Sequence, residues 1–358
     1  MHAMPWPGLK SPAEGSSGYD SLRFGAGRAA CDLMGSYLLT GAAGFIGARV
    51  AELLLEAGHR VRGLDDLNPS YDPRLKDYRL ARLRKFPGFE FSKVDISDRS
   101  TLAQEWGEQG YEAVLNIAAR AGVRASVRRP WEYAQTNLLG TINLLELCKE
   151  RGVAKLVQAS TSSLYGADTP RPFQEEAPIG RPLSPYAATK GAAELMTHAY
   201  HHLHGLDVTV LRYFTVYGPA GRPDMSIYRF IQWIAEDRPL RLHGDGQQAR
   251  DFTFVDDTAR GTVAALRPFG YEVINLGGDR PWKLMDAVHR IEELLGKQAR
   301  VERHPPDAAD VPATWASIAK ARQLLDWEPR TEFADGLEKT VRWYLQEREW
   351  AKEVDTSD

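Results

Sequence analysis

The sequence has few cysteines, no long apolar run and no excess of charge of either sign. Cys31 and Cys148 are its two cysteines in 358 residues, and neither lies in a CxxC pair or a Cys/His cluster, so we expect no disulfide framework and no metal site. No run of about 18 apolar residues occurs, which predicts no membrane span. Lys and Arg number 45 against 48 Asp and Glu, so no general basic field would hold a nucleic acid. These absences favour a cytoplasmic protein without a nucleic-acid, membrane or metal partner.

The alternation of apolar segments predicts the fold class. Residues 1–34 are rich in Gly, Ser, Pro and Ala and lack both periodicity and the apolar core of a secretory signal, so we expect a flexible extension there. From Ser36 onward, short apolar runs alternate with segments of helical period, which is typical of a parallel sheet covered by helices. The pattern predicts strands near 36–40, 59–64, 89–94, 112–117, 153–160 and 207–213, and helices near 44–57, 99–107, 131–150 and 186–204.

The alternation loosens after Pro219, where proline becomes frequent. We therefore predict a Rossmann-type, doubly wound α/β domain over residues 35–218. A smaller α+β lobe over 219–350 would close over the carboxyl edge of its sheet, where open α/β sheets bind ligands, and 351–358 would form a tail.

A glycine-rich turn follows the first predicted strand. Gly41 permits the tight turn, Gly44 lets the backbone approach a pyrophosphate at the helix N-terminus, and Gly47 allows the helix to pack closely on the strand. Asp65, 18 residues after Gly47, stands where an acid meets the ribose hydroxyls of the adenosine. Because its carboxylate would repel a 2′-phosphate, the order strand, turn, helix, strand and acid predicts NAD rather than NADP.

A tyrosine and a lysine four residues apart form a candidate catalytic pair. Helical spacing places Tyr186 and Lys190 on one face, where a fixed cation and a nicotinamide charge would lower the phenol pKa from its usual value near 10. Thr161, 25 residues earlier at the end of a predicted strand, could bond the reacting oxygen. The YxxxK spacing alone is common and more often structural, so the prediction depends on all three residues together.

The GxxGxxG spacing and the later motifs resemble the extended short-chain dehydrogenase/reductase family. The resemblance implies that Thr161, Tyr186 and Lys190 are catalytic. It also implies a role for Arg120, which stands where many relatives have Gln. The implied cofactor-binding residues are Gly41, Gly44, Phe45, Ile46, Gly47, Asp65, Asp66, Asn68, Asp95, Ile96, Ala118, Ala119, Arg120, Asn137, Tyr186, Lys190 and Tyr213.

Within that family, the stretches 119–127, 213–219, 221–225 and 250–257 are similar to those of the UDP-glucuronate 4-epimerases. The resemblance implies that the lobe binds a nucleotide sugar. It also implies that the protein epimerises a UDP-sugar at C4 through a 4-keto intermediate and converts UDP-glucuronate to UDP-galacturonate. Hydroxyl groups and an arginine suit a sugar carboxylate. The implied substrate-binding residues are Arg124, Thr161, Ser162, Ser163, Tyr186, Thr215, Arg222, Arg250 and Asp310.

Three alternatives remain open at this level. UDP-glucose/UDP-galactose 4-epimerases share the chemistry and differ in the pocket around C6. UDP-glucuronate decarboxylases typically carry Glu where Ser163 stands, which disfavours that reaction. A non-catalytic NAD-binding regulatory protein would have no need of the three catalytic residues.

The helices near 131–150 and 186–204 correspond to the dimer interface of the family and so imply a homodimer.

Overall fold

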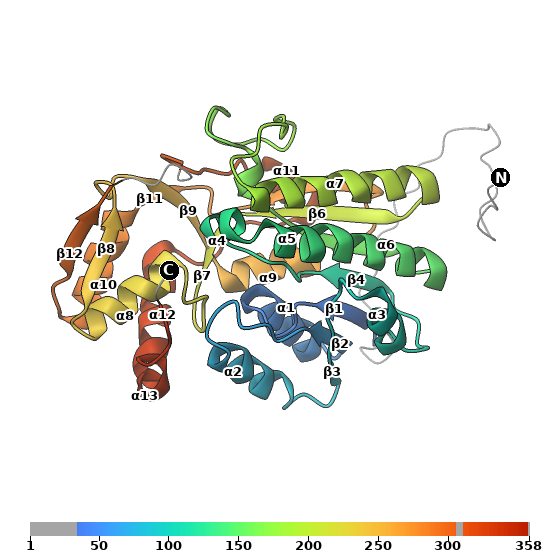
Figure 1. Cartoon of the computed structure of the whole chain (residues 1–358), viewed down its shortest axis with the longest axis horizontal. Helices are drawn as coiled ribbons and strands as arrows, with labels where there is room; N and C mark the ends of the chain where they lie inside the picture. Colours follow the sequence, from blue (N-terminus) through green and yellow to red (C-terminus); the bar gives the residue numbers. More distant parts are fainter. Residues whose placement is uncertain (1–33, 306–310, 357–358) are drawn as a thin grey trace, which may run out of the picture. The chain divides into compact units, whose positions relative to one another are not determined.

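A seven-stranded parallel sheet forms the centre of the chain (Figure 1). The computed structural model describes residues 34–305 and 311–356, so the predicted extension and Asp310 lie outside the described residues. The strands run in the order β10-β6-β5-β4-β1-β2-β3, and every pair is parallel. They are β1 (Ser36–Thr40), β2 (Arg60–Asp65), β3 (Phe89–Lys93), β4 (Ala113–Asn116), β5 (Lys155–Thr161), β6 (Asp207–Tyr213) and β10 (Tyr271–Leu276).

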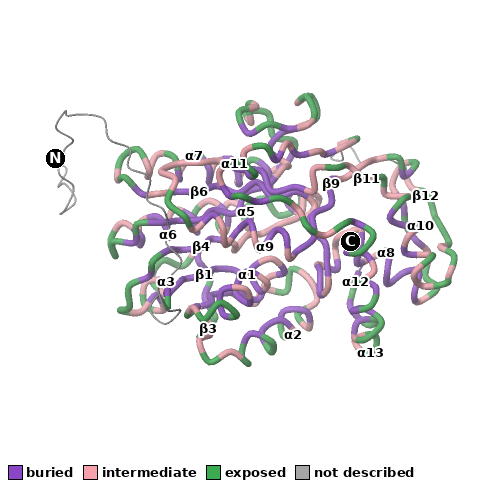
Figure 2. The backbone as a smooth tube through the Cα atoms, turned by 180° about the vertical axis from the view of Figure 1, so that it is seen from behind, coloured by how far each residue is buried: buried purple, intermediate pink, exposed green. Residues whose placement is uncertain are grey.

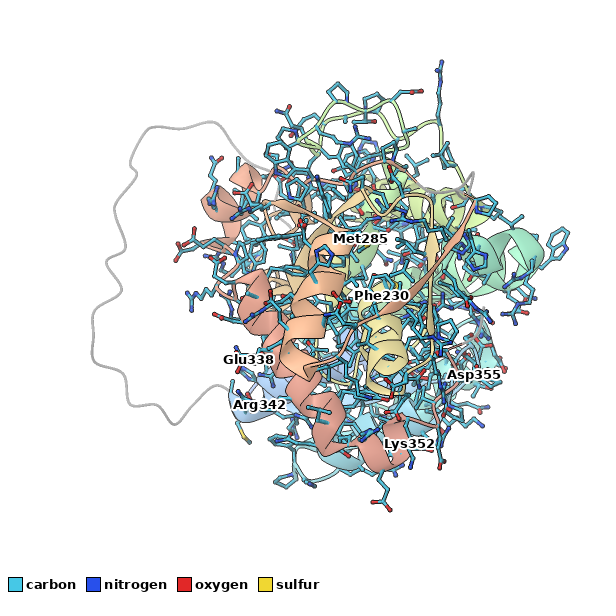
Figure 3. The ribbon with its side chains drawn as sticks, turned by 90° about the vertical axis from the view of Figure 1, so that its left-hand side faces the viewer. Phe230, Met285, Glu338, Arg342, Lys352 and Asp355 are labelled. Carbon is cyan, nitrogen blue, oxygen red and sulfur yellow. The ribbon has the colours of Figure 1, made fainter. Side chains whose placement is uncertain are left out.

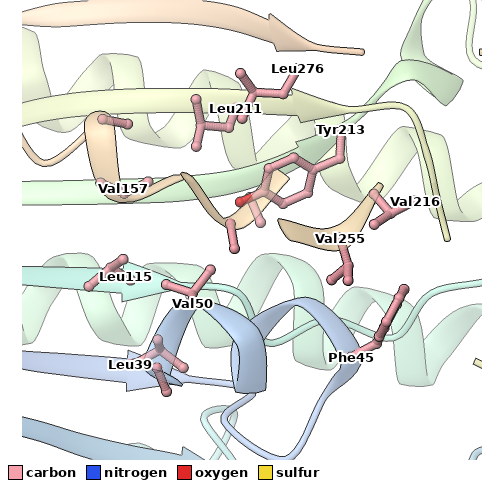
Figure 4. Close-up of a cluster of buried hydrophobic side chains, with 14 of the residues drawn as sticks. Leu39, Phe45, Val50, Leu115, Val157, Leu211, Tyr213, Val216, Val255 and Leu276 are labelled. Carbon is pink, nitrogen blue, oxygen red and sulfur yellow. The ribbon is translucent and has the colours of Figure 1, made fainter. Parts of the chain in front are cut away.

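Helices cover both faces of this sheet, because successive strand residues point to opposite sides. On β1, Leu39 packs in a cluster with Val50 of one helix (Figure 4). Leu38 packs in another cluster with Leu144 of a second helix. The first face carries α1 (Phe45–Glu56), α9 (Val255–Ala264) and α11 (Ala319–Leu325), with α2 (Arg74–Leu83) against α1. The second carries α3 (Arg99–Glu105), α6 (Gly140–Arg151) and α7 (Pro185–His204). Burial on both faces explains the nearly continuous apolar strands, which are mostly in the buried colour in Figure 2.

Shorter elements follow β4 and β5 and lie next to α7. They are α4 (Val123–Arg128), α5 (Pro130–Tyr133), the π-helical turn η1 (Ala134–Leu139) and the 3₁₀ turn η2 (Ser162–Leu164). The predicted helix near 131–150 is therefore built from α5, η1 and α6.

The segment after residue 219 forms the predicted α+β lobe, but it also returns to the large sheet. A second apolar cluster packs α8 (Ser226–Ala235), α10 (Leu284–Leu295), α12 (Phe333–Gln346) and α13 (Arg348–Ala351), and Figure 3 looks onto these helices. Two small sheets complete the lobe: β7 (Thr215–Tyr217), β9 (Ala249–Phe254) and β11 (Pro281–Lys283) in one, and β8 (Pro239–His243) with β12 (Arg300–His304) in the other. Strand β10 and helices α9 and α11 instead pack on the Rossmann sheet. A boundary at residue 218 therefore leaves these three elements of the Rossmann layer on the lobe side.

The described part of the tail packs onto the lobe. Val354 and Thr356 are buried, and the Thr356 hydroxyl donates to Gln232 Oε1 over 2.6 Å. The Arg74 side chain of α2 forms an ion pair with Glu353 at 3.1 Å. These contacts tie residues 351–356 to both α8 and α2.

Candidate active site

A cavity of about 1020 Å³ lies at the carboxyl ends of the parallel strands. Every sequence-predicted site residue lines it except Asn137 and Asp310, and Asp310 lies outside the described residues. The order of strands reverses beside β1, where β4 stands on one side and β2 on the other, and ligands of such sheets bind at that reversal. Residues of the lobe, among them Arg222 and Arg250, form the opposite wall.

The glycine-rich turn leaves the start of α1 open to this cavity. Gly41 adopts a φ of +73°, and a side chain on Gly47 would place its Cβ 2.1 Å from the Gly41 carbonyl oxygen. Helix α1 starts after Gly44 without a side-chain cap, so its first N–H groups are free to bind an anion. The turn therefore fits the diphosphate of a dinucleotide, as its sequence predicts.

Two cations compensate the acids at the end of β2: Lys76, which the sequence did not identify, and Arg120, which the resemblance places at the cofactor. Asp65 accepts hydrogen bonds from the backbone N–H of Ala43 at 3.2 Å and of Leu67 at 2.8 Å, and its Oδ1 lies 3.0 Å from Nζ of Lys76. Asp66 lies 3.4 Å from Nη2 of Arg120. Lys76 is buried against Asp65, so the carboxylate that favours NAD over NADP has a charged partner. Eleven residues separate the pair, and no local pattern reveals it.

The three predicted catalytic residues come together where β5 meets α7. Thr161 ends β5, and its hydroxyl forms a hydrogen bond with the phenol of Tyr186. Tyr186 lies in the first turn of α7, which Ser184 caps by accepting from the backbone N–H of Ala187 at 3.2 Å. The ring of Tyr186 packs edge-on against Tyr133, with 6.2 Å between centroids. The sequence offered no signal for Tyr133.

Burial changes the proton affinity of both catalytic side chains on α7. Burial raises the pKa of Tyr186, and the hydrogen bond from Thr161 and the charge of Arg222 oppose that rise. Burial also lowers the pKa of Lys190 to about 8, against the charge of Glu194. In the chain itself, loss of hydration outweighs the nearby positive charge of Arg222. A lower phenol pKa under a fixed cation together with a nicotinamide charge stays a prediction for the cofactor-bound protein.

A buried ion pair fixes the helix turn behind Lys190. Glu194 binds Arg212 of β6 through two contacts, at 2.8 and 3.1 Å, and accepts from the hydroxyl of Ser160. In residues 34–305 and 311–356, the Lys190 ammonium has no hydrogen-bond or ion-pair partner, although it is buried and lines the cavity. A buried ammonium in that situation fits the ribose hydroxyls of a bound dinucleotide.

Hydroxyl groups line the cavity beside Thr161. Ser162 and Ser163 occupy η2, and the Ser163 hydroxyl lies 3.2 Å from that of Thr161. Thr215 begins β7 and faces the same cavity.

Arg222 carries a partner that sequence reasoning did not assign. Its Nε donates to Asp224 over 3.0 Å and its Nη2 binds the same carboxylate. Asp224 stands two residues later in a stretch already used for the resemblance, so this pairing could have been anticipated. The guanidinium also reaches the carbonyl of Ala121 at 3.4 Å, which holds it on the cavity wall.

Asn137 supports the cavity from behind. It is buried, its Oδ1 accepts from the backbone N–H of Arg120 at 2.8 Å, and its amide donates to the carbonyl of Arg120 at 3.0 Å. The amide also reaches the hydroxyl of Thr189 at 3.1 Å. Its position favours a structural role over direct cofactor contact.

No group of three or more His, Cys, Asp or Glu in residues 34–305 and 311–356 is arranged to hold a metal ion. Across the same residues, no helix has the length and apolar character needed to cross a membrane.

The fold and this cavity define an NAD-dependent enzyme of the epimerase/dehydratase type. The chain belongs to the NAD dependent epimerase/dehydratase family, whose model matches residues 37–277. It is 53% identical to the UDP-glucuronate 4-epimerase of Thermodesulfobacterium geofontis over 322 residues, which is 90% of this chain and 99% of that protein.

Solved structures agree with this assignment. The UDP-glucuronic acid 4-epimerase of Bacillus cereus, in complex with UDP-glucuronic acid and NAD, has a TM-score of 0.81 and 38% identity, with 87% of this chain and 99% of that one covered. The UDP-glucose 4-epimerase of Thermotoga maritima, with UDP-glucose, also has a TM-score of 0.81, at 30% identity, and the same coverage. The cofactor of this chain is NAD.

Proposed function

We propose that the protein is an NAD-dependent UDP-glucuronate 4-epimerase that interconverts UDP-glucuronate and UDP-galacturonate. The observation that carries the substrate is the hydroxyl set at the end of β5, where Thr161, Ser162 and Ser163 face the cavity without an acidic side chain among them. Hydroxyl donors bind a carboxylate well, and Arg222 lines the same cavity.

The catalytic residues act on the hydroxyl at sugar C4. Tyr186 removes the proton of that hydroxyl and returns a proton after the 4-keto sugar has turned its other face, with Thr161 bonded to the same reacting oxygen. Bound NAD accepts the C4 hydride and gives it back, so the net reaction has no redox change. The ammonium of Lys190 holds a positive charge near the phenol and so stabilises its ionised form.

The 4-keto sugar also explains why the carboxylate must be held. A uronic acid oxidised at C4 is a β-keto acid, which loses CO₂ when the carboxylate bond aligns with the ketone. A set of fixed hydroxyl groups around the carboxylate keeps that bond out of alignment. Ser163 forms a hydrogen bond with Thr161 and occupies the position at which decarboxylases typically carry a glutamate.

A neutral UDP-sugar is the second candidate, and one observation favours it. Asp224 already balances the charge of Arg222, so the cavity wall does not require an anion there. UDP-glucose/UDP-galactose epimerisation would use Thr161, Tyr186 and Lys190 in the same roles.

Product analysis separates these functions. Purified protein is incubated with UDP-glucuronate or UDP-glucose, without added metal, and the products are separated by anion exchange and identified by NMR. We expect UDP-galacturonate, with kcat/KM for the uronate exceeding that for UDP-glucose by about tenfold or more. UDP-galactose as the main product would favour the second candidate, a UDP-pentose would indicate decarboxylation, and no product from either would favour a regulatory NAD-binding protein.

We also propose that the protein is a homodimer. Exposed apolar side chains gather on neighbouring segments beside α7: Trp131 on α5, Leu139 on η1, and Leu195 and Leu203 on α7 itself. Large apolar groups exposed together mark an interaction surface, and a second copy would bury this one against itself. Sedimentation should give twice the chain mass of 40.0 kDa, and Leu195→Asp with Leu203→Asp should give the monomer. A wild-type monomer at micromolar concentration would contradict the proposal.

We propose that the protein is located in the cytoplasm, because Cys148 is a free thiol and not part of a disulfide. Cys148 is buried with a free thiol, and burial raises its pKa to about 12, so it packs as a small apolar group. Fractionation of the host cell would check this location, and recovery with membranes or outside the cell would contradict it.

A further inference from the structure

Arg120 bridges two loops that lie on opposite sides of the glycine-rich turn. It follows β4, whereas its partners Asp66 and Ser70 follow β2, and β1 stands between those two strands. Nη1 of Arg120 donates to the Ser70 hydroxyl at 2.6 Å, and Nη2 lies 3.4 Å from Asp66. A contact between the loops after β4 and β2 must cross over the turn that follows β1. All three side chains line the cavity.

The backbone of Arg120 is fixed while its side chain keeps an unused donor. Asn137 bonds both the N–H and the carbonyl of Arg120 and is itself tied to Thr189, between the catalytic residues of α7. The Nε of Arg120 is buried and has no hydrogen-bond partner. A guanidinium presents donors in a rigid fork that matches phosphate oxygens, so this side chain has donor capacity left for an anion in the cavity.

If Arg120 moves away from Asp66, the negative charge of the Asp66 carboxylate still has a positive neighbour. Nζ of Lys76 lies 3.7 Å from the Asp66 carboxylate, so a cation remains when the guanidinium turns to another anion. A dinucleotide diphosphate on the glycine-rich turn would lie below the bridge, next to the start of α1.

We propose that Arg120 is a clasp that closes over bound NAD and holds its diphosphate in the cavity. A 4-epimerase returns the hydride to the same sugar and regenerates NAD in each cycle, so it gains from a cofactor that does not leave. The inference uses the NAD assignment and is independent of which UDP-sugar is the substrate.

The test measures cofactor dissociation in the absence of sugar. Protein loaded with NADH is mixed with a large excess of NAD, and the decay of NADH fluorescence gives the dissociation rate. We expect Arg120→Gln to release NADH about tenfold faster or more, because a charge-assisted contact is lost, and Arg120→Lys, which keeps the charge without the fork, to fall between.

Arg62 provides a matched control outside the cavity. Its guanidinium makes two ion pairs, with Glu90 at 2.9 Å and Glu105 at 3.1 Å, and its Nε, like that of Arg120, is buried without a partner. Arg62→Gln should therefore cause a similar loss of thermal stability and leave NADH dissociation within twofold of wild type.

Three results would overturn the clasp. Dissociation from Arg120→Gln within twofold of wild type would show that the bridge does not retain the cofactor. Equal acceleration in Arg62→Gln would show general loosening instead. Failure of wild type to bind NADH at all would overturn the NAD assignment and the clasp with it, whereas failure of the UDP-glucuronate assay would affect only the substrate.

Discussion

Replacement of Tyr186 by phenylalanine is expected to lower kcat by about a thousandfold, within the range that one general acid–base group contributes. On α7, the phenol of Tyr186 is the group that contacts the Thr161 hydroxyl. The substitution removes only the phenol oxygen. The ring keeps its edge-on contact with Tyr133, so folding and NAD binding should persist. The measurement is kcat with UDP-glucuronate, together with the NAD content of the purified variant.

Tyr37→Phe controls for the loss of a buried phenol elsewhere. Tyr37 lies at the start of β1, where its hydroxyl donates to Glu112 at 3.4 Å, and it does not line the cavity. Its variant should keep activity within twofold. A Tyr186→Phe variant with more than a tenth of wild-type kcat would mean that another group transfers the proton.

Lys190→Met is expected to lower activity at least about a hundredfold while stabilising the cofactor-free protein. The ammonium is buried without a direct partner among the described residues, and its pKa falls from 10.5 to about 8. The charged form therefore costs the folded state on the order of 3 kcal/mol, which methionine removes. Urea unfolding of NAD-stripped wild type and variant measures the difference.

The stability difference should depend on pH in a defined direction. The folded pKa of Lys190 lies below the unfolded value, so the cost is complete below about pH 8. Between pH 8 and 10.5 the unfolded chain binds more protons, wild type gains stability, and the advantage of Lys190→Met disappears.

Lys155→Met is the matched comparison on a second buried lysine. Lys155 has a carboxylate partner, Asp207, so the same substitution leaves an uncompensated acid and should destabilise the protein. If Lys190→Met is less stable than wild type at pH 7, the ammonium is not a cost to the fold and our account of its burial is wrong.

Local sequence patterns determined the strands and most of the helices of the predicted Rossmann domain, but helix α2 was not predicted. The predicted strands at 36–40 and 207–213 match β1 and β6, and the other four lie within two residues of theirs, because alternation and helical period are visible over a few residues. The glycine spacing and the four-residue step from Tyr186 to Lys190 are also local, and they identified the cofactor turn and the catalytic helix.

The tertiary structure alone decided which distant residues meet. Strand β10 joins the large sheet from within the predicted lobe, and Lys76 and Arg120 take partners that no periodic pattern specifies. Burial raises the pKa of Tyr186, a contribution that spacing along the chain does not reveal. Period and spacing are properties of neighbouring residues, whereas ion pairing and desolvation depend on the order of strands and the packing around them. The sequence by itself therefore determined the fold class and identified the candidate catalytic residues. The fold decided which charged groups surround them and which two loops Arg120 joins.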